Sequence, residues 1–294
     1  MIERGLQRVH LRELLGSELR LPILAVNIND QQDLNAAVEA ANEAQSPIIL
    51  MVSVRAIEHS GLATILHLFR SATENSNMPV WLQLDHATDL SLIKECIAVG
   101  FDIVMADFSR EPVEENVRNT REVVNLAHAS NVFVEGEVTA IPDDGTTNRL
   151  GDHFTSPQEA RDFALRTGVD LLAVAVGNIH GFVRQKPELK TDLIRTISSA
   201  TTTPLVLHGA DYCSSDAIMQ AVRSGITKVN LGPEFREAYC LALRSAIKNC
   251  DWHAPDHRVI LNEARVAVRE AILRRFCELT RKAYDVSRLQ KNPG

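Results

Sequence analysis

The sequence has few of the features that mark a secreted, membrane-spanning or nucleic-acid-binding protein. Its five cysteines are widely scattered and form no C-x-x-C pair, which is typical of reduced thiols rather than of a disulfide framework. No apolar run approaches the roughly 20 residues that span a bilayer, and the first residues lack the layout of a secretory signal. The formal net charge of −7 gives no reason to expect a nucleic acid or a membrane as partner. We therefore expect a cytoplasmic protein that acts on small molecules.

Nucleotide-binding motifs are absent too, since neither a G-x-G-x-x-G nor a Walker sequence occurs. Short apolar runs instead alternate with helix-like segments along the chain. The runs are nearly continuous in Val, Ile and Leu, as in parallel strands that are covered on both faces. The expected strands lie near residues 22–27, 47–53, 79–84, 101–106, 132–138, 169–176, 204–208 and 226–231.

Eight strand-then-helix units over about 230 residues predict an α/β protein with a (β/α)₈ TIM barrel. A doubly wound sheet is the rival, but such a sheet rarely reaches eight regular units without a glycine-rich nucleotide turn. We expect one domain over residues 1–294, with the barrel over about 21–250 and a C-terminal helix over about 257–289.

Two segments fall outside the regular alternation. Residues 139–155 form a long polar stretch after the fifth strand, which places a lid-like loop at the catalytic rim of a barrel. The C-terminal helix carries several arginines, and its pattern predicts a packing helix with a charged outer face. The alternatives are a subunit contact or an arginine that enters a neighbouring subunit's site.

Three of the ten histidines each end a predicted strand, namely His86, His180 and His208. The carboxyl ends of barrel strands form the catalytic rim of this fold. Three neutral imidazoles would leave one zinc coordination position open for water or substrate. From the residues alone, the alternatives are one shared metal site and three unrelated polar side chains.

Acidic and amide residues occur at the same strand ends. Asp85 precedes His86, so the two side chains point to opposite faces unless the strand is already turning into its loop. Asp85 could hold a ligand histidine, transfer protons or simply cap a turn. Glu135 and Glu137 share one face of the fifth strand, where burial is costly unless they are paired or bound to a metal.

Many short motifs then show a family resemblance. They are Ala25-Val26-Asn27, the run from Ser46 to Ser53, Leu84-Asp85-His86, Val104-Met105-Ala106-Asp107, Val134-Glu135-Gly136-Glu137, the run from Thr155 to Ala160, Gly177-Asn178-Ile179-His180-Gly181 and Leu205-Val206-Leu207-His208-Gly209. In these motifs and their order, residues from about 21 to 283 resemble the class II, zinc-dependent fructose-bisphosphate and tagatose-bisphosphate aldolases.

The resemblance implies specific roles for the residues that match. His86, His180 and His208 would bind Zn²⁺ or another divalent metal, Glu137 would reach the metal in its resting position, and Asp85 would be the catalytic proton carrier. The substrate-binding residues would be Asn27, Ser53, Gly181, Arg184, Gly209, Asp211 and Asn230. The resemblance also implies ketone or aldehyde substrates and a homodimer or homotetramer.

The chain departs from the family where that family binds phosphate. The family continues its third metal histidine as His-Gly-Gly-Ser-Gly, whereas this chain reads His208-Gly209-Ala210-Asp211-Tyr212. The second phosphate element, Asn-Ile-Asp-Thr, is here Asn230-Leu231-Gly232-Pro233, and Pro233 lacks a backbone N–H. Asp211 therefore puts negative charge where a phosphate would bind.

We accordingly expect a metal-dependent aldolase-type lyase that cleaves or forms a C–C bond next to a zinc-polarised ketone, and whose substrate is not the standard bisphosphate. One alternative is an ordinary bisphosphate aldolase in which other groups, such as Arg184, hold the phosphate. A non-catalytic relative that keeps the barrel as a binding protein, or a metal hydrolase, would be further alternatives.

Overall fold

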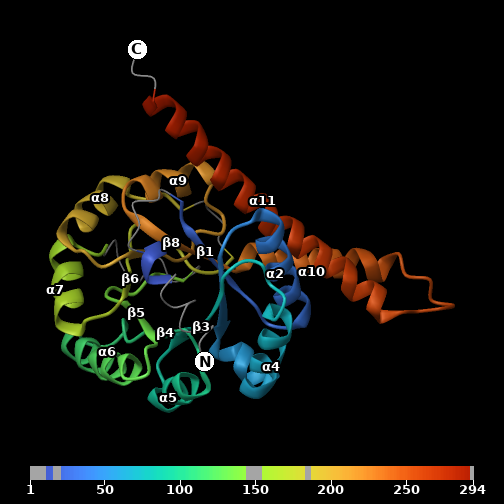
Figure 1. Cartoon of the computed structure of the whole chain (residues 1–294), viewed down its shortest axis with the longest axis horizontal. Coiled ribbons are helices and arrows are strands. Elements are labelled where there is room, and N and C mark those ends of the chain that lie inside the picture. Colours follow the sequence, from blue (N-terminus) through green and yellow to red (C-terminus); the bar gives the residue numbers. More distant parts are fainter. Residues whose placement is uncertain (1–10, 16–20, 144–153, 183–186, 292–294) are drawn as a thin grey trace.

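Eight parallel strands form a closed barrel in the order β1 to β8, with helices around the outside (Figure 1). The computed structural model describes residues 11–15, 21–143, 154–182 and 187–291. The strands are β1 (Ile23–Asn27), β2 (Ile48–Ser53), β3 (Val80–Ala87), β4 (Ile103–Ala106), β5 (Phe133–Glu137), β6 (Leu171–Ala173), β7 (Leu205–Leu207) and β8 (Ile226–Leu231). The predicted (β/α)₈ barrel is confirmed.

The helices follow the strands in sequence. They are α2 (Gln31–Ala44), α3 (Val54–Ser60), α4 (Leu62–Thr73), α5 (Leu90–Val99), α6 (Val113–His128), α7 (Pro157–Thr167), α8 (Thr191–Ala200), α9 (Ser215–Arg223), α10 (Pro233–Lys248) and α11 (His257–Lys291). Local sequence explains several starts. Asp30 and Ser156 form capping boxes at α2 and α7, and Pro157 occupies the first turn of α7.

Side chains inside the barrel change from apolar at the bottom to polar at the rim. The lower interior is a buried cluster that includes Ile23, Ala25, Ile49, Trp81 and Phe133. Since strand side chains alternate between the two faces, the next inward positions along the same strands carry polar groups such as Asn27 and Asp85. The apolar residues close the barrel, and chemistry is confined to the carboxyl ends of the strands.

The long helix α11 packs across α2, α9 and α10 and continues past α9 (Figure 1, red). Val268, Ile272 and Phe276 follow one another at four-residue spacing and are buried against the barrel's helices. Arg269 pairs with Glu43 of α2 at 3.0 Å. None of the described helices is long and apolar enough to cross a membrane.

Candidate metal centre and substrate pocket

Three histidines from different strand ends converge at the barrel mouth. His86 belongs to β3, while His180 and His208 follow β6 and β7. Their ring centroids lie 4.7 to 5.5 Å apart, and one nitrogen of each lies within 4.8 Å of the others. The structure thus brings together the three side chains that the strand-end positions single out.

The backbone of β3 lets both Asp85 and His86 reach the mouth although they are consecutive. His86 has a φ of +47°, in the left-handed region, and the pairing of β3 with β4 shifts register between Leu84 and Ala87. Such a bulge redirects a side chain that regular alternation would turn away. A non-glycine residue in this conformation is strained, and such strain tends to occur at functional sites.

Carboxylates hold two of the imidazoles by the nitrogen that faces away from the cluster. Nδ1 of His86 lies 2.7 Å from Oδ2 of Asp107, and Nε2 of His208 lies 2.7 Å from Oε1 of Glu135. Nε2 of His86 and Nδ1 of His208 then face each other at 3.1 Å. Pairing of the outer nitrogen with an acid is the usual arrangement for a metal-ligating histidine, because it sets the tautomer and the ring orientation.

The charges around the cluster favour neutral imidazoles except at His86. Burial lowers the pKa of His180 and of His208, and each also feels the neighbouring His86. Burial would lower the pKa of His86 as well, but the carboxylates of Asp85, Asp107 and Glu137 raise it to about 10. A cation is therefore favoured at this position, in the form of either a proton or a metal ion.

Buried side-chain atoms without a hydrogen-bond partner indicate whether a metal ion would fit between the histidines. Among the described residues, Oδ1 of Asp85, Oε2 of Glu137 and Nε2 of His180 are buried without a hydrogen-bond partner. When ionised, the carboxylate oxygens have only lone pairs to offer, and the neutral imidazole of His180 offers one as well, so a cation is a natural partner for all three. Three imidazoles with nearby carboxylates suit a divalent ion such as zinc.

Glu137 lies beside the histidines at the end of β5. Its Oε1 accepts hydrogen bonds from Oγ of Ser109 and from the backbone N–H of Ile141, both at 3.0 Å. Burial and the nearby Asp107 raise the pKa of Glu137 to about 8. His86, Asp107 and Glu137 form a second set of donor atoms within 4.8 Å of one another. Glu137 could thus ligate a metal that lies near His86.

A buried polar network supports His208 from inside the barrel. Nζ of Lys228 donates to Oε2 of Glu135 at 2.8 Å and to Oδ1 of Asn230 at 2.7 Å, and all of these residues are buried. Burial opposes ionisation of Glu135, but the Lys228 ammonium holds its pKa well below the usual range. Sequence reasoning missed Lys228. The available signal was its two-residue spacing from Asn230, which puts both on one face of β8.

Asp85 is positioned by an amide from the first strand. Nδ2 of Asn27 donates to Oδ2 of Asp85 at 2.8 Å, and both residues line the pocket at the mouth. The predicted neighbours Gly181, Gly209, Asp211 and Asn230 line the same pocket, which has a volume of about 160 Å³. Gly209 has a φ of +60°, and a Cβ there would lie 2.3 Å from the carbonyl oxygen of Ile179, so only glycine fits.

Of the other predicted substrate residues, Ser53 does not line this pocket. It caps α3 by accepting a hydrogen bond from the N–H of Ala56 at 3.2 Å. Arg184 lies outside the described residues, as do residues 144–153 of the predicted lid.

Arg236 at the pocket rim was not predicted. Its guanidinium lies 5.3 Å from the ring centroid of Phe182, whose ring lies 6.5 Å from that of Tyr212. Such stacking places a cation at the outer edge of the pocket. Nothing in the sequence pattern distinguishes Arg236 from the other charged residues of an exposed helix.

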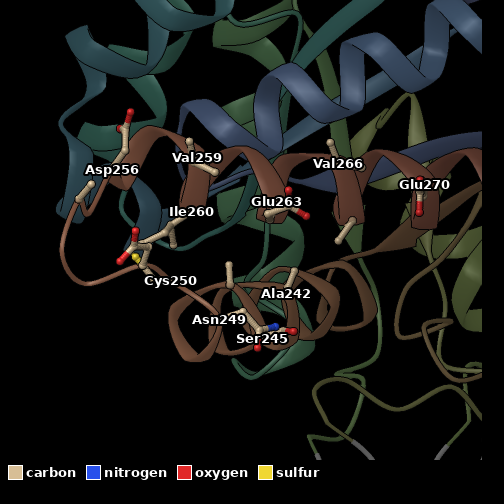
Figure 2. Close-up of a pocket in the computed structure, with 14 residues that line it drawn as sticks. Ala242, Ser245, Asn249, Cys250, Asp256, Val259, Ile260, Glu263, Val266 and Glu270 are labelled. Carbon is tan, nitrogen blue, oxygen red and sulfur yellow. The ribbon is translucent and has the colours of Figure 1, made fainter.

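A larger groove lies between α10 and α11 (Figure 2). None of the three histidines lines it. Its lining combines apolar side chains such as Val259 and Ile260 with polar groups and carboxylates, and it includes no basic side chain or histidine. Trp252 and Val259, in the same region, are 66% and 60% exposed. Among the residues that the structure describes, no metal-binding group falls in this groove. The homodimer or homotetramer stays a prediction.

Comparison with known proteins agrees with the geometry. Residues 17–283 match the protein family described as fructose-bisphosphate aldolase class-II. The chain is 33% identical over 277 residues to a fructose-bisphosphate aldolase of Geobacillus stearothermophilus, covering 92% of this chain and 96% of that protein.

Solved structures show the same similarity. The YdjI aldolase of Escherichia coli K12 superposes with a TM-score of 0.80 at 29% identity, over 92% of this chain and 96% of that one. A putative fructose-1,6-biphosphate aldolase of Coccidioides immitis gives a TM-score of 0.81 at 26% identity, over 95% and 96%.

Proposed function

Because the chain belongs to the class II fructose-bisphosphate aldolase family, we propose that it is a zinc-dependent lyase that cleaves or forms a C–C bond beside the carbonyl of a hydroxylated ketone. One observation carries the proposal. The donor atoms of His86, His180 and His208 lie within 4.8 Å of one another, with an unpaired oxygen of Asp85 in the same pocket.

His86, His180 and His208 would hold the metal, and Glu137 would be an additional ligand near His86. A bound divalent cation would polarise the ketone and stabilise the negative charge that develops on its oxygen. Asp107 and Glu135 would keep the ligand nitrogens of His86 and His208 turned inward through their hydrogen bonds.

Asp85 would exchange a proton with the hydroxyl on the carbon whose bond breaks or forms. The Asn27 amide fixes one carboxyl oxygen, so the unpaired Oδ1 is the atom that can take or return the proton. Asn230 lines the pocket close to His208, where its amide could orient a substrate hydroxyl.

The substrate would not be the standard sugar bisphosphate. Asp211, Gly232 and Pro233 replace the residues with which the family receives phosphate, and all three line the pocket. Two like charges within about 4 Å repel by roughly 4 kcal/mol at an effective dielectric of 20, which is nearly three decades in affinity. An uncharged or cationic ketone would fit this pocket better.

The proposal is tested with purified protein loaded with Zn²⁺. Fructose 1,6-bisphosphate, tagatose 1,6-bisphosphate and non-phosphorylated ketoses are incubated with the enzyme, and the aldehyde and ketone products are identified by mass spectrometry. We expect retro-aldol cleavage that a chelator abolishes and Zn²⁺ restores, with a preference for non-phosphorylated ketoses. Efficient cleavage of fructose 1,6-bisphosphate would contradict the substrate class, and cleavage that survives chelation would contradict the metal-dependent reaction.

A further inference from the structure

The pocket ends at the N-terminus of α10, where the loops that follow β7 and β8 meet. Asp211 of the first loop is buried, with 4% of its surface exposed. Its Oδ1 accepts a hydrogen bond from the backbone N–H of Gly232 at 2.6 Å and another from that of Glu234 at 3.2 Å. A side chain of the protein itself therefore caps this helix.

The cap leaves no backbone N–H group free in the first turn of α10. Pro233 has no N–H, and the N–H groups of Phe235 and Arg236 both donate to the carbonyl of Gly232 at 3.1 Å. A helix N-terminus binds an anion through unpaired N–H groups. Here those groups already have partners within the chain.

Contacts on both sides hold the cap in place. Arg275 of α11 donates to the backbone carbonyl of Asp211 at 2.7 Å and pairs with Glu234 at 2.8 Å. On the pocket side, a Cβ at Gly232 would lie 2.4 Å from Oδ1 of Asn27. The absence of a side chain at Gly232 lets its backbone lie against Asn27 while its N–H donates to Asp211.

We propose that Asp211 sets the substrate specificity by filling the anion site at α10, so that the end of the ketone facing this helix carries a neutral hydroxyl group instead of a phosphate. The hydroxyl would donate to Oδ2, since both backbone N–H groups donate to Oδ1. This inference rests on the proposed aldolase function, because that function places a ketone between the histidines and α10.

Arg236 is the alternative source of affinity for a phosphate, because its guanidinium also lines the pocket. That group lies over Phe182 at the rim, however, and not at the backbone donors of α10. An Arg236→Gln variant separates the two sources, since it leaves the Asp211 cap intact.

The test measures binding of inorganic phosphate to the zinc-loaded protein by calorimetry and by the NMR signals of the Gly232 and Glu234 amides. Asp211→Ser removes the carboxyl group and shortens the side chain, which makes room for a phosphate at the N-terminus of α10, whereas Asp211→Asn keeps the site filled without charge. We expect Asp211→Ser to bind phosphate at least about tenfold more tightly than wild type, with both amide signals shifting. Wild type should bind phosphate most weakly. Asp211→Asn removes the charge repulsion but keeps the site filled, so it should bind phosphate less tightly than Asp211→Ser and leave both amide signals in place. Phosphate that binds directly to zinc should do so equally in all variants, so it does not affect the comparison.

Wild-type protein whose Gly232 and Glu234 signals shift with phosphate would overturn the inference, as would a folded Asp211→Ser variant with no gain. A gain in affinity in Asp211→Asn equal to that in Asp211→Ser would also overturn it, because charge alone would then explain the exclusion of phosphate.

If Asp211→Ser does not fold, the inference is tested on the wild-type protein, by competition between 1,3-dihydroxyacetone and its monophosphate for binding. Tighter binding of the hydroxyketone supports the inference and tighter binding of the phosphate ester contradicts it. All these readouts are equilibrium binding, so they are distinguishable from a failure to detect C–C cleavage.

Discussion

Glu135 and His208 form a hydrogen-bonded pair inside the barrel, with Oε1 of the carboxylate 2.7 Å from Nε2 of the imidazole. The other carboxylate oxygen accepts from Nζ of Lys228 at 2.8 Å. This pair turns Nδ1 of His208 toward His86 and away from the barrel core. The carboxylate therefore controls which imidazole nitrogen is available to a metal.

Replacement of Glu135 should weaken metal binding without removing a ligand. We expect Glu135→Gln to lower the affinity for Zn²⁺ by about 10- to 100-fold, because the outer nitrogen of His208 loses its charged acceptor. Competition with a chromogenic chelator measures the affinity. Glu122→Gln makes the same chemical change at an exposed site on α6 and should leave the affinity unchanged. Equal affinities of Glu135→Gln and wild type would contradict a positioning role.

The histidine cluster itself predicts metal stoichiometry. Wild type should retain one Zn²⁺ per chain, and His180→Ala should lose both the metal and the aldolase activity, because a three-histidine site loses a ligand. Elemental analysis after gel filtration gives the metal content. His67→Ala, on the exposed face of α4, serves as the matched control. Full zinc occupancy in His180→Ala would remove this residue from the ligand set.

Replacement of Asp85 should distinguish metal binding from proton transfer, because this residue is proposed to transfer the proton without binding the metal. We expect Asp85→Ala to keep its Zn²⁺ but to lose about 10²- to 10⁴-fold in kcat, which is the usual contribution of a general acid or base. Asn27→Ala should lower kcat by a smaller factor, since the carboxyl group stays but loses its orienting amide. Steady-state kinetics and metal analysis on the same samples measure both effects. Full activity of Asp85→Ala would refute the proton-transfer role.

Replacement of Arg275 should destabilise the protein more than replacement of Arg269 on the same helix. The Arg275 side chain is 13% exposed and binds Glu234, whose side chain is 18% exposed. Loss of one partner of a fully buried pair costs about 3–5 kcal/mol in free energy of unfolding, and this partly buried pair should cost up to that amount, so Arg275→Leu should be clearly destabilised. Arg269→Leu removes an exposed pair on the same helix and should cost about 0–1 kcal/mol. Urea denaturation compares the two, and similar losses would contradict the assignment.

The buried carboxyl of Asp211 predicts a pH dependence of stability. Burial, together with the nearby Glu234, raises its pKa to about 7, whereas an unfolded chain ionises near its ordinary value of about 3.9. The contribution to stability is then full below about pH 4 and is lost as the pH rises toward 7, by up to about 1.4 kcal/mol per pH unit.

Asp211→Asn has no group to titrate at this position. The free energy of unfolding of wild type minus that of Asp211→Asn should therefore decrease between about pH 4 and pH 7 and stay constant above. Urea denaturation of the metal-free proteins over this range measures the difference. A difference that does not change with pH would show that the carboxyl is not buried as described.

The fold was predictable because strand and helix periodicity are local properties of a sequence. All eight predicted strands occur, with ends that shift by a few residues at β3, β4 and β6. Parallel neighbouring strands bring their carboxyl ends to one rim, so the strand-end positions of His86, His180 and His208 predicted that all three lie at this rim. These positions left open whether the three side chains form one shared site.

Pairings between distant residues could not be predicted in the same way. Lys228 and Glu135 are 93 positions apart, and Arg275 and Asp211 are 64 apart. The helical pattern of α11 predicted arginines on a charged outer face, with a subunit contact or a neighbouring subunit's site as the alternatives, and did not predict a contact within this chain. Only the packing of α11 on α10 brings Arg275 to the Asp211 carbonyl.

The sequence by itself determined the barrel, the rim and the kinds of side chain that reach it, because each follows from alternation of residues along one segment. The tertiary structure decided the bulge that turns His86 inward, the carboxylate behind His208 and the capping of α10 by Asp211. These depend on side chains from separate strands and loops meeting in a low-dielectric interior, where every buried donor and acceptor needs a partner.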